Sequence, residues 1–67
     1  MRFEQYEIWV LNGERWEMVS WFRDFEVASA VARGRSRRVR LIHAVYEGSK
    51  RLQEEIIAEV GDTREKP

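Results

Sequence analysis

Few residues in this chain of 67 have side chains suited to catalysis, and they are scattered. Cysteine is absent and His43 is the single histidine, so thiol nucleophiles and thiolate metal sites are excluded. The serines lack a nucleophile motif, and no glycine-rich phosphate loop is present. Glu54 and Glu55 are adjacent, so on a strand their carboxylates point to opposite faces and cannot act as a pair. We therefore predict no enzyme activity, no cofactor and no metal site.

His43 is the one side chain whose ordinary titration falls near neutral pH. It lies in the apolar run LIHAVY, where a strand would place it on the same face as Leu41 and Val45. We expect a packed histidine with a satisfied hydrogen bond rather than a general base.

Binding chemistry is the stronger signal, because ten residues, 32 to 41, hold five arginines. Cations that follow a helix are stabilised by its dipole, which accounts for some of them, and Arg40 could pair with Glu55 or Glu59 on a neighbouring strand. Next to exposed aromatic side chains the same guanidinium groups could instead hold a phosphate backbone. Twelve acidic residues balance the twelve basic ones, which weighs against a dedicated nucleic-acid domain. We predict a charged rim of Arg33, Arg35, Arg37, Arg38 and Arg40.

The first element that could position these groups is a hairpin, because Asn12-Gly13 stands between alternating apolar residues. Strands are expected at about 4 to 11 and 14 to 22. A two-residue loop would put Tyr6, Ile8 and Val10 on one face with Arg15, Glu17 and Val19. A three-residue loop with Gly13 in the left-handed conformation would instead place them with Trp16 and Met18. Burial favours the second register, because a slip of one residue inverts every side chain.

A short helix is expected after this hairpin, in RDFEVASAVARG. Asp24 is a suitable N-cap and Gly34 a suitable stop. The apolar positions recur at helical spacing and are mostly small, so the helix can lie close to a sheet; they are Val27, Ala28, Val31 and Ala32.

The last third of the chain predicts a strand, VRLIHAVY, a turn at EGSK, and a final segment that is ambiguous. Residues 52 to 60 could be a helix, giving β-β-α-β-α, but the short turn favours a hairpin partner. The fold class is therefore α+β, with the order β-β-α-β-β. It forms one domain over residues 1–61, followed by a frayed tail at 62–67.

One face of such a sheet is open, because a single helix covers only the other. We expect the covered face to hold Tyr6, Ile8, Val10, Trp16, Met18, Phe22, Leu41 and Val45. The open face then carries more apolar side chains than a soluble monomer usually exposes to water, which indicates a partner-binding surface. Its residues are Trp9, Leu11, Val19, Trp21, Ile42 and Tyr46, with Ile57 at its margin.

We thus expect a non-enzymatic protein-interaction module that forms a homodimer or binds a partner protein through this aromatic face and its arginine rim. Folds of this size occur among bacterial accessory subunits and phage-encoded inhibitors, which suggests such a role by analogy. The alternative is a single-stranded nucleic-acid-binding domain that uses the same Trp and Arg residues. No apolar run is long enough to span a membrane and the N-terminus carries charge, so a cytoplasmic location is expected.

Overall fold

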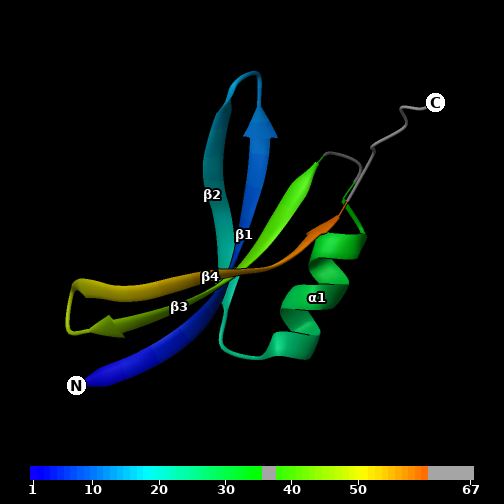
Figure 1. Ribbon diagram of the computed structural model, residues 1–67. Helices are drawn as coiled ribbons and strands as arrows, with labels where there is room; N and C mark the ends of the chain where they lie inside the picture. Colours follow the sequence, from blue (N-terminus) through cyan, green and yellow to red (C-terminus); the bar gives the residue numbers. More distant parts are fainter. Residues whose placement is uncertain (36–37, 61–67) are drawn as a thin grey trace.

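The computed structural model describes residues 1–35 and 38–60, which form one antiparallel sheet and one helix (Figure 1). The elements are β1 (Arg2–Asn12), β2 (Arg15–Phe22), α1 (Phe25–Arg33), β3 (Val39–Glu47) and β4 (Lys50–Val60). The strands lie in the order β2-β1-β3-β4. This confirms the α+β class and shows that residues 52 to 60 are a strand. Arg37 and the tail predicted at 62–67 lie outside the described residues. Within the described ranges no helix is long and apolar enough to cross a membrane.

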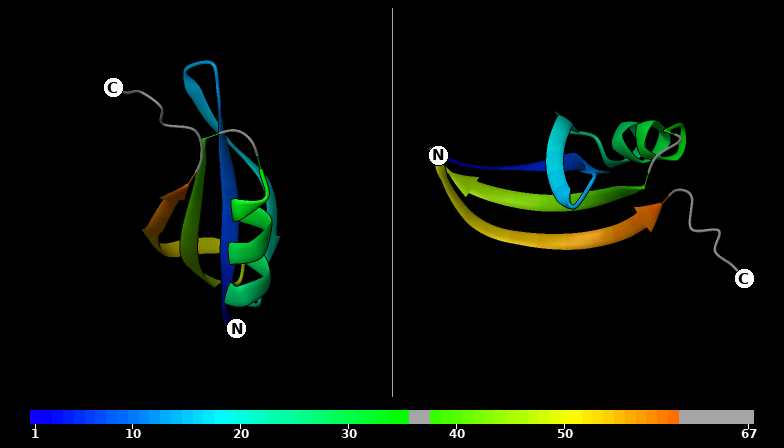
Figure 2. Two further views of the ribbon diagram at one scale, coloured as in Figure 1. Left: turned by 90° about the vertical axis from the view of Figure 1, so that its right-hand side faces the viewer. Right: turned by 90° about the horizontal axis from the view of Figure 1, so that it is seen from above.

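The helix begins and ends where the sequence predicts. The Oδ1 atom of Asp24 accepts a hydrogen bond from the backbone N–H of Glu26 at 3.0 Å, which satisfies one free donor of the first turn. At the other end the N–H of Gly34 donates to the carbonyl oxygens of Ala30 and Val31. Ala28 and Ala32 are fully buried, so α1 lies close against the sheet (Figure 2).

The hydrophobic core lies between α1 and the two central strands. It consists of Ile8 and Val10 from β1, Val39 and Leu41 from β3, and the helix alanines. Tyr6, Phe22, Val31 and Ala58 pack around it and are partly buried. The predicted covered face is thus confirmed for Tyr6, Ile8, Val10, Phe22 and Leu41. Three of the buried apolar residues are alanines, so this core is small even for a short chain.

The predicted register of the first hairpin is wrong. Asn12 pairs with Arg15 around a two-residue turn in which Gly13 has a φ of 69°, and this pairing puts Trp16 and Met18 on the open face. The tip of the hairpin projects beyond α1 in Figure 1, so burial does not select the register there. A bulge at Val19 then restores the expected alternation, and Ser20 and Phe22 fall on the helix side.

The second hairpin has a similar turn and a more irregular outer strand. Glu47 pairs with Lys50 around Gly48, whose φ is 62°. The pairing of β4 with β3 skips Leu52 and again Ile57, so β4 has two bulges. Bulges increase strand bending, and β4 bows away from α1 in the right-hand view of Figure 2.

Candidate interaction surface

The open face is the side of the sheet opposite α1, and its central row combines apolar residues with one carboxylate. Glu7 on β1 is paired with Trp21 on one side and with Ile42 on the other, and Ile42 is paired with Ile56. Glu7 is 0% exposed and Ile42 is also buried, whereas Trp21 and Ile56 at the two ends of the row are about half exposed. The middle of the open face is therefore sealed by the chain's own side chains.

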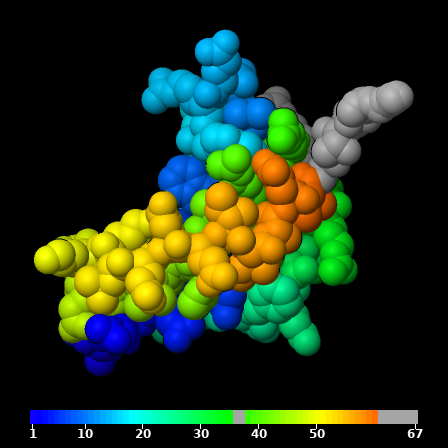
Figure 3. Space-filling model, viewed as in Figure 1, coloured from blue at the N-terminus to red at the C-terminus, as the bar shows by residue number. Residues whose placement is uncertain are grey.

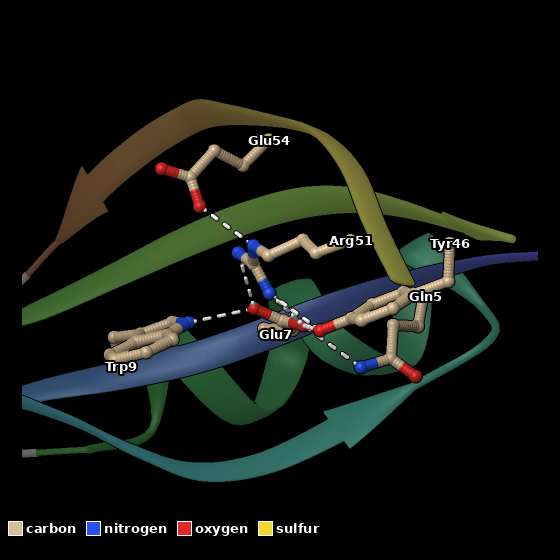
Figure 4. A network of polar contacts seen from close by, with 6 residues as sticks. All are labelled: Gln5, Glu7, Trp9, Tyr46, Arg51 and Glu54. Atoms are coloured by element: carbon tan, nitrogen blue, oxygen red, sulfur yellow. Dashed lines mark hydrogen bonds and ion pairs between the residues drawn. The ribbon is translucent and has the colours of Figure 1, made fainter. Parts of the chain in front are cut away.

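Five hydrogen bonds converge on the Glu7 carboxylate (Figure 4). Its Oε1 accepts from Trp9 Nε1 at 2.9 Å and from an Arg51 guanidinium nitrogen at 3.0 Å. Its Oε2 accepts from Gln5 Nε2 at 2.8 Å, from the Tyr46 hydroxyl at 2.9 Å and from the second terminal nitrogen of Arg51 at 3.0 Å. A buried charge is tolerated when it is paired and fully hydrogen-bonded, as it is here.

Arg51 reaches this carboxylate from β4, across the intervening strand β3. The bulge at Leu52 lies immediately after Arg51 and bends β4 at this point. The guanidinium lies 5.5 Å from the centre of the Tyr46 ring, and its Nε donates to Glu54 at 2.7 Å. The ring of Phe3 stacks on that of Tyr46, with centroids 5.2 Å apart. Arg51 and Tyr46 thus cover Glu7 and tie the outer strand β4 to the central strand β1.

The pKa values in this cluster follow from burial and from the ion pair. Burial pushes the pKa of Glu7 upward, but hydrogen bonds from Arg51, Trp9, Gln5 and Tyr46 outweigh it and leave the pKa below its ordinary value. Burial beside the Glu7 carboxylate raises the pKa of Tyr46. The hydrogen bond to Glu7 raises the pKa of Arg51 further. Glu7 is therefore ionised with both oxygens occupied, which suits it to hold the sheet together rather than to accept a proton from a substrate.

The arginine rim is partly engaged in contacts of its own. Arg40 and Arg38 both bind the Glu59 carboxylate, at 3.2 Å and 3.5 Å, so the expected pairing of Arg40 across the second hairpin is confirmed for Glu59. The Arg40 guanidinium also lies over the Trp16 ring, 4.1 Å from its centre. Arg33 and Arg35 are exposed at the end of α1. Of the predicted rim, Arg40 thus reaches the open face at Trp16, whereas Arg33 and Arg35 lie at the helix end.

The structure divides the predicted partner-binding residues into two groups. Ile42 is buried, and the polar ends of Trp9 and Tyr46 are held by Glu7, so these three belong mainly to the fold. Leu11 is half-buried. Trp21 is 49% exposed and Val19 is 45% exposed. Sequence reasoning missed Met18, 43% exposed on β2, and Ile56, 52% exposed on β4. With the correct register, Trp16 falls on the open face, and Met18, two residues later on the same strand, falls on that face as well.

His43, the single histidine, lies on the helix side of the sheet. His43 Nε2 lies 2.7 Å from a carboxylate oxygen of Glu4, and its ring packs 5.0 Å from that of Tyr6. The prediction of a packed, hydrogen-bonded histidine is confirmed.

Glu54 and Glu55 pair with Ala44 and His43 respectively and so face opposite sides. A shallow hollow of about 330 Å³ lies beside His43. Among the described residues, no three acidic or histidine side chains are grouped closely enough to hold a metal ion.

Comparison with known proteins finds no matching family model, no similar curated protein and no similar solved structure. The functional argument therefore depends on the surface itself.

Proposed function

We propose that this chain is a small non-enzymatic cytoplasmic module that binds protein, either a second copy or a different partner, through the open face of its sheet. The contact centre in this proposal is the β2 patch, formed by Met18, Val19 and Trp21. The role that fits best is that of an accessory or inhibitory subunit, whose activity consists of occupying a surface on another chain.

One observation carries the proposal: a half-exposed tryptophan stands with two exposed apolar neighbours on an outer strand. A tryptophan buries about 150 to 250 Å² when it is covered, and tryptophan and methionine are enriched at the centres of protein interfaces. Scattered exposed apolar residues need no explanation, but a contiguous group of this kind marks a binding surface. Trp9, which is paired with Met18 of the patch, is held by a hydrogen bond to Glu7, so one neighbour of the patch is fixed in place.

The composition around the β2 patch supports protein as the ligand. Trp16 with Arg40 stacked on it adds an aromatic-cation pair of the kind that recurs at interface hot spots. The Glu59 carboxylate binds both Arg38 and Arg40 and offsets one of their two positive charges, which lowers the positive potential that a phosphate backbone requires. The same residues therefore fit a protein surface better than single-stranded nucleic acid.

The test uses wild type and the Trp21→Glu variant as paired baits with extracts of the source cells. We expect wild type to retain one protein, which could be a second copy of the chain, and the variant to lose it. Purified components must then reproduce the binding. Leu52→Glu is the matched control, because Leu52 is similarly exposed but lies on β4. The proposal fails if no protein binds in a manner that depends on Trp21, or if a labelled oligonucleotide binds instead with steep salt dependence.

A further inference from the structure

The two outer strands of the sheet differ in how their free edges are protected. Unpaired edges invite strand addition, and proteins block them with charges and bulges. The outer strand β4 has two bulges and carries Glu54, Glu55 and Glu59. The other outer strand, β2, has one bulge, at Val19, and its residues from Met18 to Phe22 carry no charge. Of the two edges that the described residues present, β2 is the one suited to pairing with another strand.

A further feature of β2 indicates a missing neighbour. Met18, Val19 and Trp21 are all more than 40% exposed, so this segment presents apolar side chains as well as a free backbone edge. The Oγ atom of Ser20 is already buried by the chain's own residues, so the apolar side chains and the backbone edge carry the argument.

The charges at the ends of this segment identify the kind of neighbour. Glu17 precedes it and Arg23 follows it, and both are exposed. An antiparallel second copy centred on Ser20 would bring Glu17 of each chain toward Arg23 of the other, with opposite charges at both ends. Because Val19 is the extra residue of the bulge, the same arrangement brings Met18 of one chain opposite Trp21 of the other, and both side chains lie on the open face. A self-complementary patch of this kind is what a two-fold interface requires.

We infer that two copies of this chain pair edge to edge along β2, antiparallel about Ser20, and form one continuous sheet of eight strands. This inference rests on the proposed function and names its partner. The β2 patches of the two copies then meet at the two-fold axis. The pairing is strand addition, in which backbone hydrogen bonds supply affinity and the flanking side chains fix the register.

The test exchanges the two end charges and measures molar mass by light scattering across a concentration series. Glu17→Arg alone and Arg23→Glu alone each turn two attractive contacts into two repulsive ones, so each should weaken dimerisation about tenfold or more. An equimolar mixture of the two variants should recover the dimer, because both contacts are attractive in the mixed pair. The double variant should also recover it. Glu14→Arg is the matched control, since Glu14 is exposed in the adjacent turn and lies outside the paired segment.

Amide hydrogen exchange provides a second measurement that does not depend on variants. Amides in residues 18 to 22 of wild type should exchange more slowly at concentrations where the dimer forms, while those of β4 should not change. A wild type that remains monomeric up to millimolar concentration overturns the inference, as does a dimer whose mass is unaffected by either charge reversal. If such a monomer still retains another protein through Trp21, the inference fails and the proposed function stands; without that binding, both fail.

Discussion

Replacing Arg51 with methionine tests the argument that the Glu7 cluster holds the sheet together. The change keeps most of the aliphatic volume of Arg51 and removes two of the five donors to a carboxylate that is 0% exposed. Breaking a buried ion pair typically costs about 3 to 5 kcal/mol because a charge is left unpaired. Trp9, Gln5 and Tyr46 still donate to Glu7, so we expect a value at the lower end, about 3 kcal/mol. A domain of this length has roughly 3 to 10 kcal/mol in total.

The assay is urea unfolding followed by tryptophan fluorescence, with the free energy of unfolding measured for a double-mutant cycle. Arg51→Met should lower the urea midpoint by about 3 M if the slope is about 1 kcal/mol per M, a typical value for small domains. In a Glu7→Leu background the same substitution should lower the free energy of unfolding far less, because no buried carboxylate remains to be left without its ion-pair partner. A loss below about 1 kcal/mol in the Arg51→Met variant, or an equal loss in both backgrounds, would refute the reasoning.

Three further predictions concern acid stability, the helix cap and the second turn. The pKa of Glu7 is lowered in the folded chain, so the ionised Glu7 carboxylate stabilises the fold fully above its ordinary pKa of 4.5, and this stabilisation is lost as pH falls through the folded pKa. Urea midpoints measured from pH 6 to pH 2 should therefore fall less steeply in Glu7→Gln than in wild type. Asp24→Ala should lower the free energy of unfolding by about 1 kcal/mol, with Asp24→Asn as a near-neutral control. Gly48→Ala should lower the free energy of unfolding by about 1 to 2 kcal/mol, because Gly48 has a φ of 62°, a backbone conformation that alanine disfavours. No atom lies near the position that Cβ would occupy, so this backbone strain is the whole expected cost, and a change below about 0.3 kcal/mol would contradict it.

Local sequence signals account for most of the fold. The Asn12-Gly13 and Gly48 turns, the Asp24 cap and the stop at Gly34 each act within a few residues, so each could be predicted from the sequence. The short turn before residues 52 to 60 predicts a strand there, although the residues themselves also fit a helix. Tertiary pairing with β3 settles that ambiguity, as commonly happens for short apolar segments.

The three bulges could not be predicted, and they decide which side chains face outward. Extra residues at Val19, Leu52 and Ile57 each shift a register by one. The shift at Val19, together with the turn that pairs Asn12 with Arg15, puts Trp16 and Met18 on the open face. The burial of Glu7 was also missed. A glutamate on an open sheet face is expected in water, and its partner Arg51 lies 44 positions away across an intervening strand. The sequence carries one faint signal, namely that Glu7 alternates with Gln5 and Trp9, two residues whose side chains can donate to it.

The Glu7 cluster also explains why the proposed binding surface lies at the β2 side of the open face and not at its middle. An open face of this kind would leave Ile42 and Ala44 in water, but Arg51 and Tyr46 extend over the centre and both residues are buried. Replacing a buried ion pair by apolar residues is often neutral for stability, so we expect the pair to contribute more to specificity than to net stability. With the centre occupied by a satisfied polar network, a partner gains little by covering it. What remains for a partner is the uncharged edge of β2 with Trp21 beside it, and the proposed pairing would therefore use one edge of the sheet in one direction.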